Sequence, residues 1–466
     1  MSVFPMPADY AHHARRDPSK SLTLSVIGTG YLGAVHAACM ADLGHTVLGV
    51  DTDPAKVEAL NNGTAPLFEP GLDELLAKVL PTGRLRFTTD VAAVADADVH
   101  FVCVGTPQMV GENAADTTYV YAAIDALAPH VKDGALVVGK STVPVGTARK
   151  LLTKLTARVR DGVTPRLAWN PEFLREGFAI EDTVAPDRFV YGVHGDPNGP
   201  EAQADVALLD RVYAAPLATG TPRLVMDFAT AELVKVAANA FLATKISFIN
   251  AMSEVCEASG GDVVALAAAI GHDDRIGAKF LGAGVGFGGG CLPKDIRAFM
   301  ARAGELGADQ ALTFLREVDQ INLRRRARMV DLARAECGGT LIGKRVAVLG
   351  AAFKPNSDDV RDSPALDIAQ AARAAGGRVT VHDPKAIPNA MRTRPDLDYA
   401  ETVEEAVTDA DVVLHLTEWA QYRALDPATL KTLVAQPTII DGRNALDRDA
   451  WRAAGWTYRA LGRPHA

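Results

Sequence analysis

The sequence predicts an α/β protein with a parallel sheet domain at each end and an all-helical domain between them. Three observations lead to this class. Strand-like and helix-like segments alternate through the first half, a long helical stretch at 227–260 interrupts them, and the alternation returns near Gly343. Such alternation is typical of parallel sheets covered on both faces. A chain of 466 residues is long enough for about three domains.

Composition and charge exclude several classes of function. Apolar residues make up 48% and charged residues 23%, the balance of a globular protein with a substantial core. The net charge of −9 argues against a nucleic acid partner, which needs a basic face. No apolar run approaches the roughly 18 residues of a membrane span, and residues 1–20 lack the apolar stretch of a secretion signal. Five cysteines without pairing or metal spacing predict reduced thiols in the cytoplasm and no metal site; they are Cys39, Cys103, Cys256, Cys291 and Cys337.

The first domain carries a dinucleotide-binding pattern. We expect strands at 21–27, 46–50, 97–104, 135–139 and 166–168, and a helix at 31–43. The motif G-x-G-x-x-G, with Gly28, Gly30 and Gly33, falls between the first strand and this helix. Its glycines permit a tight turn and close approach of a pyrophosphate, which the helix N-terminus attracts. Asp51 ends the next strand, where it would bind the adenine ribose and repel a 2′-phosphate. The pattern predicts a Rossmann-type domain that binds NAD rather than NADP.

The helical stretch at 227–260 opens the central domain, and further helical segments follow to about residue 337. It is apolar on most sides, which predicts a buried helix. Lys235 and Asn239 lie one turn apart at the head of an apolar stripe. This lysine either extends its amine to water or enters a polar pocket, where it would stabilise a developing oxyanion.

The end of the chain repeats the organisation of its start. We expect strands at 344–349, 378–382, 410–416 and 438–441, and a helix at 365–375. Asp383 ends the second strand, as Asp51 does in the first domain, but the phosphate-binding glycines are missing and 353–363 is an insertion. This predicts a Rossmann-like fold adapted to another ligand, although any two parallel α/β domains share such strands. Lys354 and Arg443, at expected strand ends, suit phosphate or ring-hydroxyl contacts, or are surface charges.

Cys291 ends a glycine-dense run at 282–290. So many glycines imply positive φ angles or very close approach to a ligand. A helix is expected at 293–306 with Pro293 at its first position. The sulfur would then lie beside a helix N-terminus and Lys294, which both favour the thiolate. An inert buried cysteine is the alternative, and the glycines favour a nucleophile. Asp295 would either cap the helix or orient a water.

Two acidic residues, Glu172 and Glu176, follow the strand at 166–168. Asn170 could cap a helix begun by Pro171, which would place both acids on one helical face. They would then manage protons and water at a reaction centre. A solvated first turn is an equal alternative, since acids are favoured there.

Together these motifs resemble the UDP-glucose/GDP-mannose dehydrogenase family over roughly 22–446. The resemblance rests on these segments, in the family's order: GTGYLG (28–33), VGTP (104–107), STVPVG (141–146), NPEFLREG (170–177), KVAANAF (235–241), GFGGGCLPKD (286–295), FKPNSDDVRDSP (353–364) and DGRN (441–444). It implies a flexible tail at 1–20, an NAD-binding domain at 21–226, a central helical dimerisation domain at 227–338 and a C-terminal UDP-sugar-binding domain at 339–466.

The resemblance also implies roles for single residues. The implied catalytic set is Cys291 as nucleophile, Lys235 and Asn239 as oxyanion stabilisers, Glu172 and Asp295 as the acid/base pair for water, and Thr142 as a water-positioning hydroxyl. The implied cofactor-binding set is Gly28, Gly30, Tyr31, Leu32, Gly33, Asp51, Lys56, Thr106, Thr142, Glu176 and Arg361. The implied substrate contacts are Phe173, Leu174, Lys235, Asn239, Phe287, Gly288, Phe353, Lys354, Arg443, and Arg275 lent across a dimer interface.

The implied reaction is a four-electron oxidation of UDP-glucose to UDP-glucuronate by two NAD+, through a thiohemiacetal and a thioester on Cys291. The same chemistry on GDP-mannose or another nucleotide sugar is the alternative. A two-electron dehydrogenase of the 6-phosphogluconate or hydroxyacyl type, and a nucleotide-sensing protein with a dead site, are less favoured. Many relatives have serine at Gly290 and phenylalanine at Leu292, differences that concern mainly the sugar. The implied partners are the nucleotide sugar and a second copy bound through the central helices, as a dimer or within a higher oligomer, with no nucleic acid and no membrane.

Overall fold

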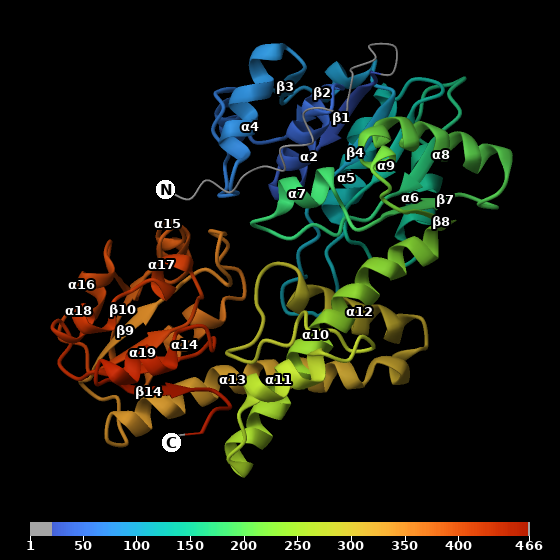
Figure 1. Cartoon of the computed structure of the whole chain (residues 1–466). Coiled ribbons are helices and arrows are strands. Elements are labelled where there is room, and N and C mark those ends of the chain that lie inside the picture. Colours follow the sequence, from blue (N-terminus) through green and yellow to red (C-terminus); the bar gives the residue numbers. More distant parts are fainter. Residues whose placement is uncertain (1–20, 465–466) are drawn as a thin grey trace. The chain divides into compact units, whose positions relative to one another are not determined.

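The computed structural model describes residues 21–464, so the predicted tail at 1–20 lies outside the described residues (Figure 1). The chain forms two compact units. Of the described residues, the first contains those up to Pro107 together with Ala115–Lys235, and the second contains Gln108–Ala114 and those from Val236 onward.

The first unit is built on an eight-stranded sheet with the order β3-β2-β1-β4-β5-β6-β7-β8. Its neighbouring strands pair in parallel, apart from β6 and β7. The first six strands have the 3-2-1-4-5-6 order of a Rossmann fold, as predicted. The strands are β1 (Thr23–Ile27), β2 (Thr46–Val50), β3 (Leu85–Thr88), β4 (Val99–Val102), β5 (Leu136–Gly139), β6 (Arg166–Trp169), β7 (Phe189–Val193) and β8 (Arg223–Asp227).

Two hydrophobic cores cover the two faces of this sheet. Leu24 and Val26 of β1 belong to one core and Ile27 to the other, because successive side chains of a strand point to opposite faces. The first core is completed by α2 (Tyr31–Asp42), α4 (Leu72–Val79), α7 (Ala179–Val184) and α8 (Pro200–Val212), and the second by α5 (Thr118–Leu127) and α6 (Thr147–Thr156). The unit also contains α3 (Pro54–Asn61), α9 (Ala214–Ala218) and the 3₁₀ turns η2 (Leu80–Thr82), η3 (Val91–Val94) and η4 (Ala128–His130).

The second unit contains a six-stranded parallel sheet with the order β11-β10-β9-β12-β13-β14. This is again 3-2-1-4-5-6 in chain order, so the predicted repetition of the fold is confirmed. Its strands are β9 (Arg345–Leu349), β10 (Arg378–His382), β11 (Asp398–Tyr399), β12 (Val412–His415), β13 (Thr438–Asp441) and β14 (Thr457–Ala460). The helices that accompany them are α14 (Pro364–Ala374), α15 (Ile387–Thr393), α16 (Val403–Val407), α17 (Ala420–Arg423), α18 (Pro427–Lys431) and α19 (Arg448–Ala453).

The central segment is helical, as predicted. Its elements are α10 (Phe228–Ser259), α11 (Val263–Gly271), α12 (Leu292–Glu305), η5 (Asp309–Leu312) and α13 (Phe314–Glu336). The expectation of a buried helix at 227–260 holds for most of α10 but not for one row, in which Phe241, Phe248 and Val255 are 67%, 49% and 56% exposed. Elsewhere α10 packs: Ala240 and Ala243 join a core with residues of α12 and α13, and Ile249 and Cys256 join another with Val263 of α11.

The helix expected from Pro171 is not formed, because 171–175 is a loop and the next helix begins at Ala179. Asn170 does not cap it. Its Oδ1 accepts hydrogen bonds from Lys140 Nζ (3.0 Å) and Tyr213 Oη (2.8 Å), and its Nδ2 donates to the carbonyl of Val190 (3.0 Å). With its side chain held in the interior, Asn170 ends a strand rather than starting a helix.

Candidate active site

The predicted nucleotide loop in the first unit has the geometry that its glycines suggest. Gly28 has a φ of +90° and donates its N–H to the carbonyl of Val50 (2.8 Å). A side chain at Gly33 would collide with the backbone of Gly28, so this glycine is required for helix–strand packing. A Cβ at Gly30 would meet no atom within 4 Å. The open space at Gly30, at the N-terminus of α2, fits the pyrophosphate of a dinucleotide.

Asp51 lies at the carboxyl end of β2, beside this loop. Its carboxylate accepts hydrogen bonds from the N–H of Thr29 (2.8 Å) and from Lys56 Nζ (3.0 Å). Burial opposes ionisation of Asp51, but the hydrogen bonds from Lys56, Thr29 and Asp53 outweigh it and hold its pKa below the ordinary value. Asp51 is therefore a charged acceptor at the place where the fold puts the adenine ribose of a dinucleotide.

Tyr31 connects the nucleotide loop to the loop that follows β6. Its hydroxyl contacts the carboxylate of Glu69 and accepts the N–H of Gly177 (2.9 Å). Glu69 also accepts the N–H of Ala179 (2.7 Å). These bonds hold the backbone next to Glu176, a buried residue. The neighbouring Leu32 and Leu174 both pack against the first core.

The two motifs VGTP and STVPVG meet at the carboxyl ends of the adjacent strands β4 and β5. Thr106 Oγ1 donates to the carbonyl of Thr142 (2.6 Å), and Ser141 Oγ donates to the carbonyl of Val104 (2.6 Å). Because the strands are parallel neighbours, both loops reach the same edge of the sheet.

Glu172 is held by a residue that lies outside the sequence motifs. Lys140, only 3% exposed, directly follows β5 and places its Nζ 3.0 Å from Glu172 Oε2. The other carboxylate oxygen of Glu172 accepts the N–H groups of Phe173 (2.7 Å) and Leu174 (3.2 Å). The sequence signal was a lysine at the end of an apolar strand, immediately before STVPVG.

Phe173 brings two cations to the same loop. The guanidinium of Arg188 lies 4.0 Å from the centre of its ring, and Lys235 Nζ lies 5.6 Å from it. The Lys235 side chain as a whole is half-buried.

In the second unit, Cys291 is the N-cap residue of α12 and is exposed. The other four cysteines are buried, and burial raises the pKa of the Cys103 thiol to about 12. Cys291 is therefore the accessible thiol of this protein. Lys294, expected near the sulfur, pairs with Asp295 (Nζ–Oδ1, 2.5 Å).

Asp295, four residues after Cys291, forms a buried pair with Asn239 of α10. Asn239 Nδ2 donates to Asp295 Oδ2 (2.6 Å), and Asp295 is 2% exposed. The carboxylate of Asp295 is thus engaged by α10 and by Lys294, rather than by the backbone N–H groups of its own helix.

The glycine run is held by residues of α13, which the sequence did not single out. Asn322 accepts the N–H of Phe287 (2.7 Å) and donates to its carbonyl (2.9 Å), and Arg326 Nη2 donates to the same carbonyl (3.1 Å). Gly286 has a φ of +90°, and a side chain there would collide with Asn322. No local pattern marks Asn322, because its partner lies 35 residues away.

The glycines before Cys291 make room for the inserted segment at 353–363. A side chain at Gly288 would meet the carbonyl of Asp362, one at Gly289 the ring of Phe353, and one at Gly290 the guanidinium of Arg361. The glycine at 290 therefore leaves space for Arg361.

Three further residues predicted to contact the substrate carry positive charges: Arg443, Lys354 and Arg275. Arg443 donates to the carbonyls of Leu416 (2.7 Å), Gly286 (2.9 Å) and Phe353 (3.1 Å), so it ties the glycine run to the sheet. Lys354 Nζ lies 5.4 Å from the ring centre of Phe353. Arg275 is 89% exposed and pairs with Asp273 (2.7 Å).

The predicted residues therefore fall into two groups, one in each unit. The first unit brings together the glycine loop, Asp51, Lys56 and the residues from Thr106 to Lys235. The second brings Gly288 together with the inserted segment, and Phe287 and Phe353 with Arg443 through the backbone around them. Within 21–464, no cluster of three His, Cys, Asp or Glu residues could hold a metal ion, and no helix there is long and apolar enough to cross a membrane.

The glycine loop with Asp51, a second nucleotide-type sheet and an accessible cysteine define an NAD-dependent oxidoreductase. Residues 22–215 match the NAD binding domain of the UDP-glucose/GDP-mannose dehydrogenase family, residues 229–324 its central domain, and residues 347–448 its UDP binding domain. The chain belongs to this family. Its cofactor is NAD, and its substrate is a nucleotide sugar.

Individual relatives are similar over nearly the whole chain. A UDP-glucose 6-dehydrogenase of Rhizobium meliloti (strain 1021) is 42% identical, with 95% of this chain and 100% of that protein covered. The solved structure of a UDP-glucose dehydrogenase from Pyrobaculum islandicum is 39% identical, with a TM-score of 0.85 and coverage of 95% and 98%. That of a UDP-D-ManNAc dehydrogenase from Pyrococcus horikoshii is 26% identical, with a TM-score of 0.82 and coverage of 96% and 100%.

Proposed function

We propose that the protein oxidises UDP-glucose to UDP-glucuronate with two molecules of NAD+ per sugar. The relatives named UDP-glucose dehydrogenases are 42% and 39% identical to this chain, whereas the UDP-D-ManNAc dehydrogenase is 26% identical. The observation that carries the proposal is the exposed Cys291 at the N-terminus of α12, because a two-electron alcohol oxidation needs no covalent step.

The covalent step keeps the half-oxidised sugar in place. The thiolate of Cys291 adds to the C6 aldehyde, and the new thiohemiacetal oxygen takes up a proton. Loss of hydride from that carbon and of the proton from its hydroxyl leaves a thioester, and water then displaces the sulfur as thiolate to give the carboxylate. NAD+ would supply the hydride acceptor for both oxidations.

The other catalytic roles follow from the chemistry of each side chain. We assign Lys235 and Asn239 to stabilisation of the negative charge that develops on the C6 oxygen. Asp295 and Glu172 serve as acid and base for the attacking water, which Thr142 positions. Asn239 and Asp295 are hydrogen-bonded to each other, and Glu172 is paired with Lys140, so both carboxylates are held in defined orientations.

Binding roles are assigned to the residues around these groups. The cofactor-binding residues are Gly28, Gly30, Tyr31, Leu32, Gly33, Asp51, Lys56, Thr106, Thr142, Glu176 and Arg361. The substrate-binding residues are Phe173, Leu174, Lys235, Asn239, Arg275, Phe287, Gly288, Phe353, Lys354 and Arg443. We also propose that the protein has three functional domains: an NAD-binding domain at 21–226, a central helical domain at 227–338 and a UDP-sugar-binding domain at 339–466.

Turnover with purified protein tests the function. We expect two NADH per UDP-glucose consumed, and little activity with GDP-mannose. Cys291→Ser should reduce UDP-glucuronate formation by a factor of about 10³ or more, with NAD binding unchanged. Cys337→Ser, at a buried thiol, is the control and should retain turnover. A ratio of one NADH per sugar, or full activity of Cys291→Ser, contradicts the proposal.

We further propose that the protein is a cytoplasmic homodimer joined through the central helices. None of the five cysteines forms a disulfide, which suits a reducing compartment. Phe241, Phe248 and Val255 recur every seven residues on α10 and are exposed. An apolar row of this spacing on a helix is typical of a surface covered by a partner helix.

A further inference from the structure

Lys140 links the two loops of the first unit that carry Thr142 and Glu172. It directly follows β5, where its backbone N–H donates to the carbonyl of Val102 (3.0 Å), and Thr142 lies two residues further along the same loop. Glu172 lies on the loop after β6, the parallel neighbour of β5. Because both loops leave the same edge of the sheet, the ion pair between Lys140 Nζ and Glu172 Oε2 (3.0 Å) connects them directly.

The amine of Lys140 has a defined position in the interior. Besides Glu172, it contacts Asn170 Oδ1 (3.0 Å) and Tyr213 Oη (3.4 Å). The Tyr213 hydroxyl itself donates to Asn170 (2.8 Å), and burial holds the pKa of Tyr213 well above its ordinary value, so the hydroxyl keeps its proton. An ammonium group has three N–H donors, and each of them has a partner here. The position of the amine is therefore fixed from three directions.

Glu172 is oriented by the protein but is not sealed from solvent. Its Oε1 accepts the N–H groups of Phe173 (2.7 Å) and Leu174 (3.2 Å), while its Oε2 faces Lys140. The side chain of Glu172 is 17% exposed, whereas that of Lys140 is 3% exposed. A carboxylate offers roughly four acceptor positions, so three protein donors leave room for one further molecule, such as a water. Lys140 thus holds the carboxylate from the inner side and leaves its outer side accessible.

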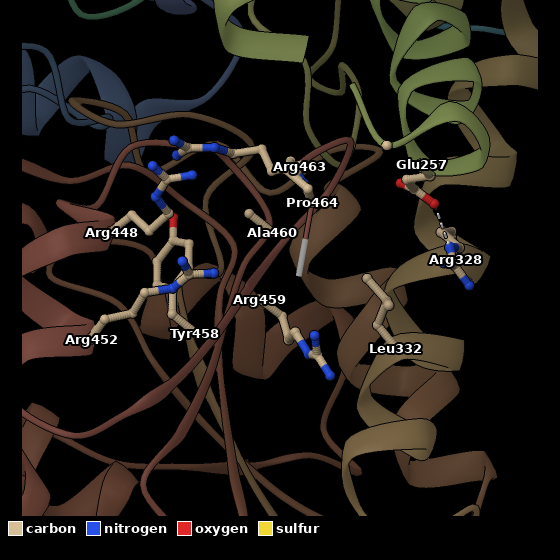
Figure 2. A pocket seen from close by; sticks show the side chains of 11 residues that line it. Glu257, Arg328, Leu332, Arg448, Arg452, Tyr458, Arg459, Ala460, Arg463 and Pro464 are labelled. Atoms are coloured by element: carbon tan, nitrogen blue, oxygen red, sulfur yellow. Dashed lines mark hydrogen bonds and ion pairs between the residues drawn. The ribbon is translucent and has the colours of Figure 1, made fainter. Parts of the chain in front are cut away.

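Other ion pairs show what a purely structural pair looks like. In the second unit, Glu257 of α10 lines a hollow of about 170 Å³ and pairs with Arg328 of α13 (2.8 Å), as Figure 2 shows. Glu257 also pairs with the buried Arg325 of α13 (2.8 Å). These pairs join two helices, and no residue with a proposed catalytic role takes part in them. The pair of Lys140 differs, because its acid is the proposed base and its lysine shares a loop with Thr142.

We propose that Lys140 is a positioning residue for hydrolysis of the thioester and that it acts through Glu172. This inference rests on the proposed function, in which Glu172 is a base for the attacking water and Thr142 positions that water. The water oxygen bonds to the thioester carbon, one water proton passes to Glu172, and the sulfur of Cys291 leaves as a thiolate. By tying the two loops together, Lys140 fixes where the carboxylate of Glu172 stands relative to Thr142. The preceding hydride transfers do not use Glu172, so they should not depend on Lys140.

Rapid-mixing kinetics of Lys140→Met test the proposal, because methionine removes the charge and keeps a similar length. At a temperature below the unfolding midpoint, we expect two NADH per chain in a first phase of near wild-type rate. Steady turnover should then be about 100-fold slower than in the wild type. Mass spectrometry of the quenched protein should show the UDP-glucuronyl thioester on Cys291. Hydroxylamine should restore fast release of the sugar, because this nucleophile attacks a thioester without a general base.

A double-mutant cycle tests whether Lys140 acts through Glu172. Glu172→Gln should slow hydrolysis by a similar factor, and adding Lys140→Met should slow it by less than about twofold more, since the carboxylate is already gone. The double variant lacks both charges of the pair, so it leaves no buried charge unpaired. If Lys140→Met alone fails to fold, the double variant is compared with Glu172→Gln instead. Lys132→Met, at an exposed pair with Asp98 in the same unit, is the control and should turn over like the wild type.

Three results would overturn the inference. The first is hydrolysis at the wild-type rate in Lys140→Met. The second is a first phase slowed as much as steady turnover, with no thioester on Cys291, because general damage to the fold would have that effect. The third is a double variant in which the effects of Lys140→Met and Glu172→Gln multiply. A ratio of one NADH per sugar in the wild type would contradict the proposed function itself, so the two failures are distinguishable.

Discussion

Among single residues, Lys140 is the buried cation that binds Glu172 and Asn170 in the loop after β6. Its amine contacts Glu172 and Asn170, each at 3.0 Å, and lies over the rings of Phe101 and Tyr213. Lys140→Met would leave the carboxylate without its partner, at a cost of about 3 kcal/mol. We expect the thermal unfolding midpoint of the first unit to fall by about 6–12 °C, measured by scanning calorimetry.

A matched control for Lys140 exists in the same unit. Lys132 pairs with Asp98 at 2.8 Å, but both side chains are about one-third exposed. Because exposed pairs contribute less than about 1 kcal/mol, Lys132→Met should shift the midpoint far less. Equal shifts of the unfolding midpoint in the two variants would contradict the prediction, because they would show that the buried pair stabilises the unit no more than the exposed one.

Asp441 predicts a pH dependence of stability in the second unit. It is fully buried and accepts hydrogen bonds from His415 Nδ1 (2.8 Å) and Tyr458 Oη (2.9 Å). Burial opposes its ionisation, but His415 and the surrounding backbone N–H groups outweigh burial and lower its pKa. A lowered pKa stabilises the fold above the unfolded value of about 3.9, and this stabilisation is lost as pH falls through the folded value.

We therefore expect the unfolding midpoint of this unit to fall steeply below about pH 4. Asp441→Asn should lower the midpoint at pH 7 and flatten its slope in acid. Asp449→Asn, at an exposed aspartate, should follow the wild-type profile. Parallel acid profiles for wild type and Asp441→Asn would contradict the assignment.

At the scale of elements, the glycine run before Cys291 depends on a backbone clamp from α13. Gly286 combines a positive φ with close contact to Asn322, which binds both backbone groups of Phe287. Gly286→Ala should displace this clamp and destabilise the unit by about 1–3 kcal/mol. We also expect a several-fold higher KM for UDP-glucose in steady-state kinetics.

Gly282→Ala is the control in the same run. An added methyl group there meets no atom within 4 Å, and the backbone of Gly282 needs no positive φ. Its stability and KM should remain close to wild type. If Gly286→Ala and Gly282→Ala have the same stability and the same KM, the contact between Asn322 and the glycine run does not affect substrate binding.

Local pattern predicted most elements of both sheets but failed at the loop after β6. Strands such as β2 and β10 have the predicted bounds, because an apolar run between turn residues is a local signal. The segment from Asn170 looked like a helix start for equally local reasons. It is a loop because Asn170 is bound by Lys140 and Tyr213, which lie 30 and 43 residues away.

For the whole molecule, the exposed face of α10 predicts self-association. We expect a dimer in sedimentation equilibrium, and Phe241→Glu combined with Phe248→Glu should raise its dissociation constant at least a hundredfold by placing charges in an apolar interface. Phe314→Glu, at a phenylalanine that is also half-exposed but lies on α13, should leave the dimer intact. A wild-type monomer at micromolar concentration would contradict this proposal.

The sequence by itself determined the two sheet domains, the helical segment between them, the nucleotide loop with Asp51, and Cys291 as the candidate nucleophile. These features are encoded locally, by the period of apolar residues and by the backbone freedom of glycine. Tertiary structure decided the partners of each polar group. Asn239 meets Asp295 across 56 residues, Lys140 pairs with Glu172, and Arg463 reaches Asp262 across 201 residues. Such contacts depend on how distant segments pack, which no short stretch of sequence specifies.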